Sequence, residues 1–358
     1  MSPGSRFPPW LARLTAGYWV LLAVVSGAGW LGADRWWLGA LNLYLPQWLW
    51  ALPGLVLTVW TFVTARRWLW VPLVCLLWVA GPIMGFQVPF PWRGWSAADE
   101  PTLRVMTWNV KYGRRDIFAL IGDIVTTKPD LLLMQDAQGT MRGPLGDLLR
   151  DWNVRSHGQY VTASRLPLSE GQVRWISFAG EKHTSLRCEL QLGPQSVAVY
   201  NVHFQTPRRG LNALRRARRR PWALPSGVEA LQGNVAARLE QAEIIAGEVR
   251  RETIPVIVAG DLNSPDASAV CRELRGAGLR DAFEEAGFGY GYTYGHFLLE
   301  RRLPEFCLPW LRIDHIMINS RFEARRCWTG TAEASDHRPV IADLGLGSVD
   351  PRVTLSLP

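Results

Sequence analysis

The stretch that decides the fold is Val256-Ile257-Val258-Ala259-Gly260-Asp261-Leu262-Asn263-Ser264-Pro265. Its four leading residues are small or β-branched and apolar, which predicts a short buried strand that ends between Gly260 and Pro265. Asp261 and Asn263 stand two residues apart, so in an extended chain both side chains would project from the same side. Asp and Asn are also common turn residues, so a purely structural role fits this stretch equally well.

Other apolar runs after residue 102 also end in polar residues. We predict strands at 103–110, 131–134, 196–203, 312–318 and 340–344, with further short strands around 160–178 and 184–192. Helices are expected at 116–127, 228–251 and 267–276. This pattern predicts a mixed α/β domain with many strands and without a run of βαβ repeats.

The first hundred residues have a different composition. Thirteen of the 19 Trp lie there, and the stretches 14–33, 36–65 and 68–92 contain no charged residue. Each stretch reaches the roughly 20 residues with which a helix crosses a bilayer. A soluble bundle would show charged faces, and no cleavage site of a signal peptide is evident. We therefore predict three membrane spans, at roughly 10–33, 47–66 and 68–88.

The domain organisation follows from this contrast. We predict a membrane domain at 1–95, a linker at 96–102, a globular domain at 103–346 and a tail at 347–358. Arg6 and Arg13 precede the first span, and Arg66 and Arg67 join the second to the third. Because arginine favours the cytoplasmic side, we expect a multi-pass protein of the cell membrane whose globular domain is extracytoplasmic.

Charge and cysteine content limit the classes of function. The formal net charge is +8, but residues 208–220 alone contain seven Arg and no acid. This argues against a generally basic domain that coats nucleic acid. The arginine run fits a solvated basic loop or helix face, a phosphate-recognition patch, a surface on anionic lipid, or a track for nucleic acid. The five Cys form no C-x-x-C pair, so neither a zinc ribbon nor a redox pair is indicated.

The polar residues at the strand ends supply the groups that phosphate chemistry requires. Carboxylate and amide oxygens are the ligands that a hard cation such as Mg²⁺ prefers. Two histidines could handle protons, and an aspartate within an apolar strand needs a partner, which a histidine would provide. Any one of these residues could be structural, but the joint occurrence favours a site. The residues are Asn109, Asp136, His203, Asp261, Asn263, Asp314, Asp336 and His337.

These residues fall in six ordered motifs: Thr107-Trp108-Asn109-Val110, Gln135-Asp136, Asn201-Val202-His203, Gly260-Asp261-Leu262-Asn263, Arg312-Ile313-Asp314-His315 and Ser335-Asp336-His337. The ordered set resembles the endonuclease/exonuclease/phosphatase superfamily, the DNase I-like fold, and membrane-anchored bacterial members look most similar. The resemblance implies a four-layer α/β sandwich, in which two packed sheets are flanked by helices. It also implies metal-dependent hydrolysis of a phosphate ester.

The resemblance assigns a cation and a water to particular residues. Asn109, Asp136 and Asp336 would bind or support Mg²⁺, with Mn²⁺ as the alternative ion. Asp261 would position or deprotonate the attacking water, assisted by Asn263. The superfamily usually has Glu where this chain has Asp136, so the side chain reaches roughly 1.5 Å less.

The remaining roles concern the phosphoryl group. His203 and His337, the latter oriented by Asp314, would stabilise or protonate its oxygens. The expected substrate contacts are Arg208, Arg209 and Asn201. Nucleic-acid phosphodiesters compete with phospholipids or other small phosphate esters as substrates. A non-catalytic membrane-bound scaffold that kept the fold is the other hypothesis. The partners indicated are the lipid bilayer and a phosphate-ester substrate, and no protein partner can be inferred.

Overall fold

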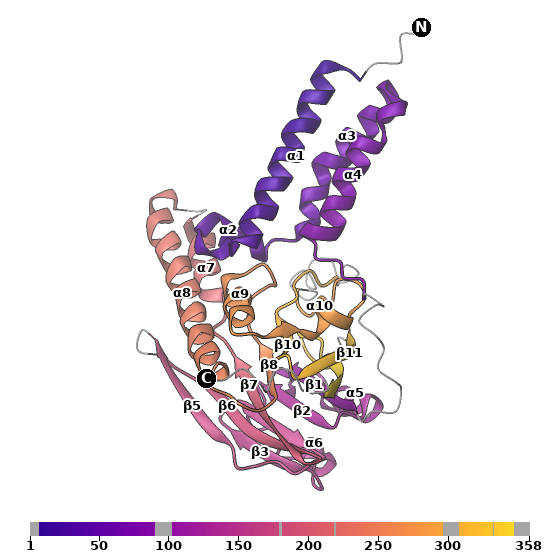
Figure 1. The fold of residues 1–358 in the computed structure, drawn as a ribbon. Helices are drawn as coiled ribbons and strands as arrows, with labels where there is room; N and C mark the ends of the chain where they lie inside the picture. The colour runs from indigo at the N-terminus through magenta and orange to yellow at the C-terminus, as the bar shows by residue number, and fades with distance from the viewer. Residues whose placement is uncertain are drawn as a thin grey trace, which may run out of the picture.

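The computed structural model describes residues 7–89, 102–178, 181–217, 220–295, 308–331 and 333–346. An N-terminal helical bundle stands on a larger α/β body, and a segment after the bundle leads down to that body (Figure 1). The predicted tail at 347–358 and all but the last residue of the predicted linker at 96–102 lie outside the described residues.

The body contains two mixed six-stranded sheets, in which only the β1/β2 and β7/β8 pairs are parallel. The first sheet has the order β11-β12-β1-β2-β4-β3 and the second has the order β5-β6-β7-β8-β10-β9. The strands of the first sheet are β1 (Thr102–Asn109), β2 (Leu131–Gln135), β3 (Asn153–His157), β4 (Tyr160–Ser164), β11 (Phe322–Thr329) and β12 (Val340–Leu346). Those of the second are β5 (Gln172–Phe178), β6 (Glu181–Leu192), β7 (Gln195–His203), β8 (Val256–Asp261), β9 (Arg280–Asp281) and β10 (Asp314–Ile318).

Apolar residues on both faces of each sheet produce four layers. Val105 of β1 and Ile257 of β8 belong to the core between the sheets, while their neighbours Met106 and Val258 face helices. The helices of the body are α5 (Ile117–Thr127), α6 (Pro144–Leu148), α7 (Arg208–Ala217), α8 (Leu224–Val249), α9 (Ala269–Gly276) and α10 (Ala282–Ala286). Helices α5 and α6 cover the first sheet, and α8 and α9 cover the second, so the predicted α/β sandwich with flanking helices is confirmed.

Several element boundaries differ from the sequence prediction. The predicted helix at 267–276 begins at Ala269, because the Ser268 hydroxyl caps it by accepting a hydrogen bond from the Cys271 N–H at 3.1 Å. Strand β3 was missed because it is a partly exposed edge strand with few apolar residues. Helix α7 occupies most of the arginine run, where the sequence analysis left a loop and a helix face as alternatives.

The bundle consists of α1 (Pro9–Trp30), α2 (Trp37–Tyr44), α3 (Ala51–Thr64) and α4 (Trp70–Trp78), with short turns η1 (Ala33–Arg35), η2 (Gln47–Trp50), η3 (Arg66–Trp68) and η4 (Val79–Ile83). Within the described residues, two helical runs are long and apolar enough to cross a membrane, Pro9–Trp30 and Gln47–Thr64. The third predicted span corresponds to α4 and η4, of 9 and 5 residues, and stays a prediction.

Several contacts fasten the bundle to the body, and two of them involve backbone groups of the body. Between α1 and α2, the Asp34 carboxylate accepts a hydrogen bond from the Ala269 N–H at the start of α9. After η4, Gln87 and Gly289 exchange backbone hydrogen bonds of 2.8 and 2.9 Å. These contacts hold the connection between α1 and α2 and the segment after η4 against the same side of the body.

Candidate active site

The sheet register gathers the central residues of the site. Strand β8 lies between β7 and β10, and Asp261 is the register partner of His203 on one side and of Asp314 on the other. All three stand at the end of a strand, so their side chains emerge at the same edge of the second sheet. Strand β1 of the first sheet ends nearby at Asn109, whose amide group donates to the Asp261 carboxylate at 3.0 Å.

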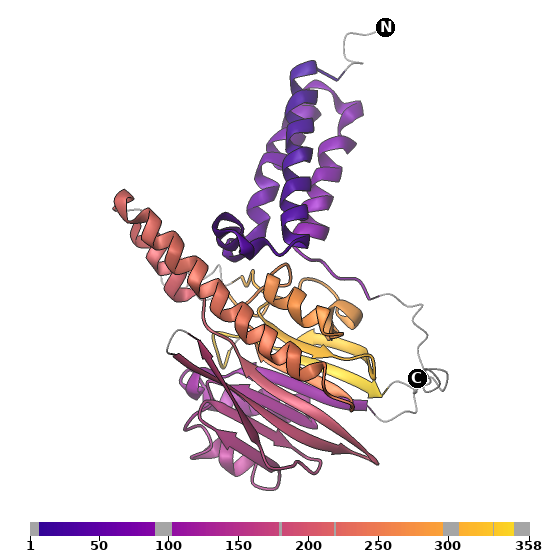
Figure 2. The same ribbon diagram turned by 60° about the vertical axis from the view of Figure 1, so that its left-hand side comes forward.

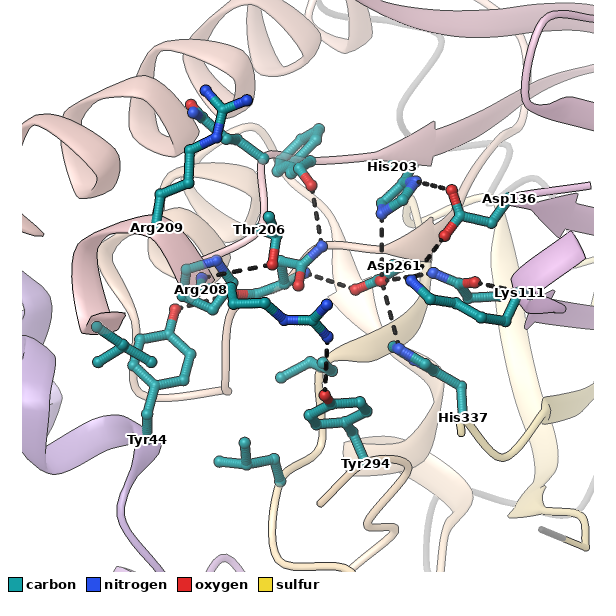
Figure 3. Close-up of a pocket in the computed structure, with 18 of the residues that line it drawn as sticks. Tyr44, Lys111, Asp136, His203, Thr206, Arg208, Arg209, Asp261, Tyr294 and His337 are labelled. Atoms are coloured by element: carbon teal, nitrogen blue, oxygen red, sulfur yellow. Dashed lines mark hydrogen bonds and ion pairs between the residues drawn. The ribbon is translucent and has the colours of Figure 1, made fainter. Parts of the chain in front are cut away.

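Asp261 is the centre of this group. Its Oδ1 accepts the Asn263 backbone N–H at 2.8 Å, while its Oδ2 lies 3.5 Å from His203 Nε2 and 3.8 Å from His337 Nε2. Figure 3 shows the two histidines on opposite sides of this carboxylate. Burial and the nearby charge of Asp314 raise the pKa of Asp261 above its usual range. A raised pKa makes the carboxylate a better acceptor for a proton from water.

His337 is oriented by Asp314, as the sequence predicted. Its Nδ1 lies 2.8 and 3.1 Å from the two carboxylate oxygens of Asp314. Burial opposes protonation of His337, but the carboxylates of Asp314 and Asp261 outweigh burial and raise its pKa to about 9. The ring is therefore an imidazolium at neutral pH, with Nε2 available as a donor beside Asp261.

Asp136 lies at the other end of the group and pairs with a residue that the sequence analysis missed. Lys111 Nζ lies 3.1 Å from its Oδ2, and His203 Nδ1 lies 3.7 Å from its Oδ1. Burial raises the pKa of Asp136, but His203 and Lys111 outweigh burial and hold it below its usual range. Gln159 completes the contact, since its Oε1 lies 2.7 Å from His203 Nδ1.

The residues around Lys111 fit a divalent cation. Asp336 has a buried carboxylate oxygen without a hydrogen-bond partner in the described part of the chain. Burial lowers the pKa of Lys111, but the negative charges of Asp136 and Asp336 outweigh burial and raise it. Asn109 and these carboxylates offer oxygen atoms of the kind that Mg²⁺ prefers. The Lys111 ammonium contributes positive charge beside the Asp136 carboxylate.

Asn263 differs from the expectation of an extended chain. Its φ of +49° turns the chain after Asp261, so the two side chains do not project from the same side. The Asn263 amide donates to the Phe204 carbonyl at 2.9 Å, and its own carbonyl accepts the Tyr44 hydroxyl at 2.8 Å. Tyr44 belongs to α2 of the bundle segment, and no sequence motif pointed to it.

A pocket of about 480 Å³ extends from Asp261 and His337 towards Tyr44. Arg208 and Arg209, in the first turn of α7, line this pocket, and their role as substrate contacts stays a prediction. Arg208 lies between the acidic group and Tyr44, where its Nη2 contacts the Tyr294 hydroxyl at 3.3 Å. The pocket thus carries positive charge from Lys111, the protonated His337 and two arginines.

The third predicted substrate contact, Asn201, has a different place. It is fully buried, and its amide nitrogen donates to the Met134 and Val161 carbonyls and to the Thr162 hydroxyl, each at 3.2 Å. Its amide oxygen accepts from Gln135 at 2.8 Å. These bonds join the two sheets, and Asn201 is not among the residues that line the pocket.

The comparisons with known proteins follow this geometry. The profile of the Endonuclease/Exonuclease/phosphatase family matches residues 106–337, and a search of the curated proteins found no match. A solved endonuclease/exonuclease/phosphatase from Beutenbergia cavernae is similar, with 19% identity, a TM-score of 0.50, and coverage of 69% of this chain and 72% of that chain. Structures from Bacteroides vulgatus (18% identity, TM-score 0.51, 69% and 100% coverage) and Bacteroides thetaiotaomicron (14%, 0.51, 70% and 100%) share the fold as well. The chain belongs to the endonuclease/exonuclease/phosphatase family, whose DNase I-like members are metal-dependent phosphoester hydrolases.

Proposed function

We propose that this protein is a membrane-anchored hydrolase that cleaves a phosphodiester or a phosphomonoester by attack of water, with the help of a divalent cation. The observation that carries the proposal is the position of Asp261. A buried carboxylate with a raised pKa lies between two histidines at the edge of a cationic pocket. This combination suits the removal of a proton from water next to a bound phosphate.

Each polar residue has a separate task in this proposal. Asp261 accepts the proton of the attacking water, while Asn109 and the backbone N–H of Asn263 hold its two oxygens in place. His337 and His203 stabilise the charge that develops on the phosphoryl oxygens. Because Asp314 fixes the imidazolium of His337, its Nε2 hydrogen is aimed towards the reacting group. Arg208, Arg209 and Lys111 attract the phosphate.

The cation would be held by Asn109, Asp136 and Asp336. When bound, Mg²⁺ or Mn²⁺ neutralises phosphate charge and lowers the pKa of a bound water. The shorter side chain of Asp136 is compatible with this role because Mg²⁺ keeps several water ligands in protein sites. Lys111 would then share Asp136 with the cation or move towards the phosphate.

Membrane anchoring is supported by the surface of the bundle. Val20, Val59 and Val63 are more than 60% exposed, at 64%, 66% and 71%. Exposed Trp10 and Trp30 stand at the two ends of α1, as in the aromatic belts of membrane proteins. We propose three spans with a cytoplasmic N-terminus, which places the body outside the cytoplasm. A reporter fused to the C-terminus tests this orientation.

The decisive experiment uses the purified full chain with Mg²⁺ or with EDTA. The substrates are DNA, RNA, phosphoinositides, sphingomyelin and a bis-aryl phosphodiester. Turnover that requires Mg²⁺ on any of them supports the enzyme, and a panel without metal-dependent turnover favours the scaffold.

Two variants of the same residue test the cation site. Asp136→Ala removes an oxygen ligand and should abolish turnover, whereas Asp136→Glu restores the usual acid of the superfamily and should preserve it. Wild-type rates for Asp136→Ala would show that Asp136 holds no cation. Mg²⁺ binding measured by calorimetry, together with thermal unfolding of both variants, separates a lost cation from a misfolded chain.

A further inference from the structure

The second half of the arginine run lies far from the catalytic group. Helix α7 has ten residues, so Arg215 and Arg216 in its last turn lie about 10–12 Å along the helix axis from Arg208, which lines the pocket. Arg215, Arg216 and Arg220 are exposed there, and the sequence contains no acid between residues 208 and 228. Phosphate recognition in the pocket therefore does not account for these three arginines.

The outer end of the α7–α8 hairpin also exposes apolar side chains. Trp222, in the turn η6 (Pro221–Ala223), is 78% exposed, and Leu224 at the start of α8 is 45% exposed. We call Arg215, Arg216, Arg220, Trp222 and Leu224 the hairpin tip. An exposed tryptophan beside arginines is typical of side chains at a membrane–water interface.

The hairpin tip has a fixed position because its two helices are tightly packed. A Cβ at Gly210 would lie 2.8 Å from the Leu231 Cα, so only glycine permits this approach of α7 to α8. Leu231 and Val235 of α8 in turn pack against Ala40 of α2. Helix α2 belongs to the bundle segment, so these contacts set the position of the tip relative to the bundle.

This position brings the tip to the level of the proposed membrane. In both views, which share one vertical axis, the outer end of α8 rises to the height of the lowest turns of the bundle (Figures 1 and 2). Exposed Trp30 and Trp48 mark the same end of the bundle, at the end of α1 and just before α3. A bilayer around the bundle would therefore meet the hairpin tip at its headgroup layer.

We propose that the hairpin tip binds the headgroups of anionic lipids in the membrane that holds the bundle. The proposal rests on the membrane anchoring proposed above. The arginines contact lipid phosphates, and Trp222 and Leu224 enter the interface. Since α7 runs from the tip to the pocket, lipid contact also fixes the entrance of the pocket at the membrane surface. A nucleic acid would meet the same charges, but a bilayer around the bundle occupies the space beside the tip.

The test measures how readily water-soluble maleimide reacts with a cysteine at position 222. The full chain carries Trp222→Cys with Cys307→Ser, because the other four cysteines are buried. Phe118→Cys in the same background is the control, since Phe118 is 71% exposed on α5. Each protein is placed in nanodiscs of phosphatidylcholine, alone or with one third phosphatidylglycerol.

Anionic lipid should slow labelling at position 222 at least about tenfold and leave position 118 unchanged. Adding Arg215→Gln, Arg216→Gln and Arg220→Gln should remove this protection and leave hydrolysis of a soluble phosphodiester unchanged. Equal labelling at both positions in anionic nanodiscs overturns the proposal, as does protection by a DNA oligonucleotide but not by anionic lipid. A chain that elutes apart from the nanodiscs overturns the membrane anchor itself, whereas turnover in solution tests the hydrolase separately.

Discussion

Two clusters with the same composition, two aspartates and a histidine, lie in one sheet region but in different surroundings. The pocket cluster consists of Asp261, Asp314 and His337, and the arginine-paired cluster consists of Asp266, Asp281 and His315. In each cluster the possible ligand atoms lie within 4.8 Å of one another, so either could hold a metal ion by distance alone. Composition and spacing therefore do not show which cluster is functional.

The two clusters differ in whether an arginine pairs with their aspartates. In the arginine-paired cluster, Arg312 donates to Asp281 at 2.7 Å and to Asp266 at 2.9 Å, and His315 lies 2.7 Å from Asp281. Burial would raise the pKa of Asp281, but Arg312 and His315 outweigh burial and hold it far below its usual range. Within the described residues no arginine or lysine contacts Asp261, whose pKa is raised. A saturated cluster stabilises the fold, and an unsaturated one can accept a proton.

The largest effect is expected for Asp261→Asn in the pocket cluster. Loss of the general base should lower kcat by about 10²–10⁴-fold. The melting temperature should hold or rise, because an ionised Asp261 with a raised pKa costs stability at neutral pH. Steady-state kinetics and thermal unfolding of the same preparation check both effects. A variant with wild-type turnover would remove Asp261 from the mechanism.

The corresponding change in the arginine-paired cluster should lower stability and leave kcat nearly unchanged. Asp281→Asn leaves Arg312 buried without its fully buried carboxylate partner and should destabilise the protein by about 3–5 kcal/mol. The kcat of the remaining folded protein should change little. The matched control is Asp147→Asn, which removes an exposed pair with Arg150 and should cost less than about 1 kcal/mol. Equal losses in denaturant unfolding would mean that burial of the pair has no consequence.

A third prediction concerns the pH dependence of stability without metal. Because folding raises the pKa of His337 from 6.5 to about 9, its contribution is fully present below pH 6.5 and is lost as the pH rises through about 9. In EDTA, His337→Gln should therefore lose less stability than the wild type between these two pH values. Urea unfolding at a series of pH values measures the difference. Parallel curves would show that the folded protein does not hold a proton on His337.

The smallest effect is expected where the bundle segment supports the pocket cluster. Tyr44→Phe removes the hydrogen bond to the Asn263 carbonyl and should cost about 0.5–1.5 kcal/mol of stability. If Tyr44 positions the turn after Asp261, kcat should fall severalfold while KM is unchanged. Tyr290→Phe is the control, because Tyr290 stacks on Tyr292 away from this turn. A loss of stability with an unchanged kcat would make Tyr44 structural only.

The sequence predicted residues that end strands better than it predicted their partners. His203, Asp261 and Asp314 lie at strand ends and carry motifs, so both the sandwich and the gathering of these residues could be anticipated. Lys111 lies in a short turn with a positive φ and belongs to no motif. Asn201 looked like a site residue because it lies two positions before His203. In a strand that spacing also fits a buried position, and the hydrogen bonds that decide its role come from the other sheet.

The arginine-paired cluster shows a second limit of prediction from the sequence. Arg312 and His315 surround Asp314 in one motif, yet their partners Asp266 and Asp281 come from distant segments without any recognisable pattern. The helical state of the arginine run depends likewise on tertiary packing, since α7 is stabilised by its close approach to α8 at Gly210.

The hydrogen bond between Tyr44 and Asn263 joins residues that are 219 positions apart. During synthesis, the bundle segment leaves the ribosome long before β8 and the turn that follows it. Contacts of such long range form late, because a large loop must close before they contribute. The turn after Asp261 therefore gains its hydrogen bond from Tyr44 only when α2 has packed against the segment that follows β8.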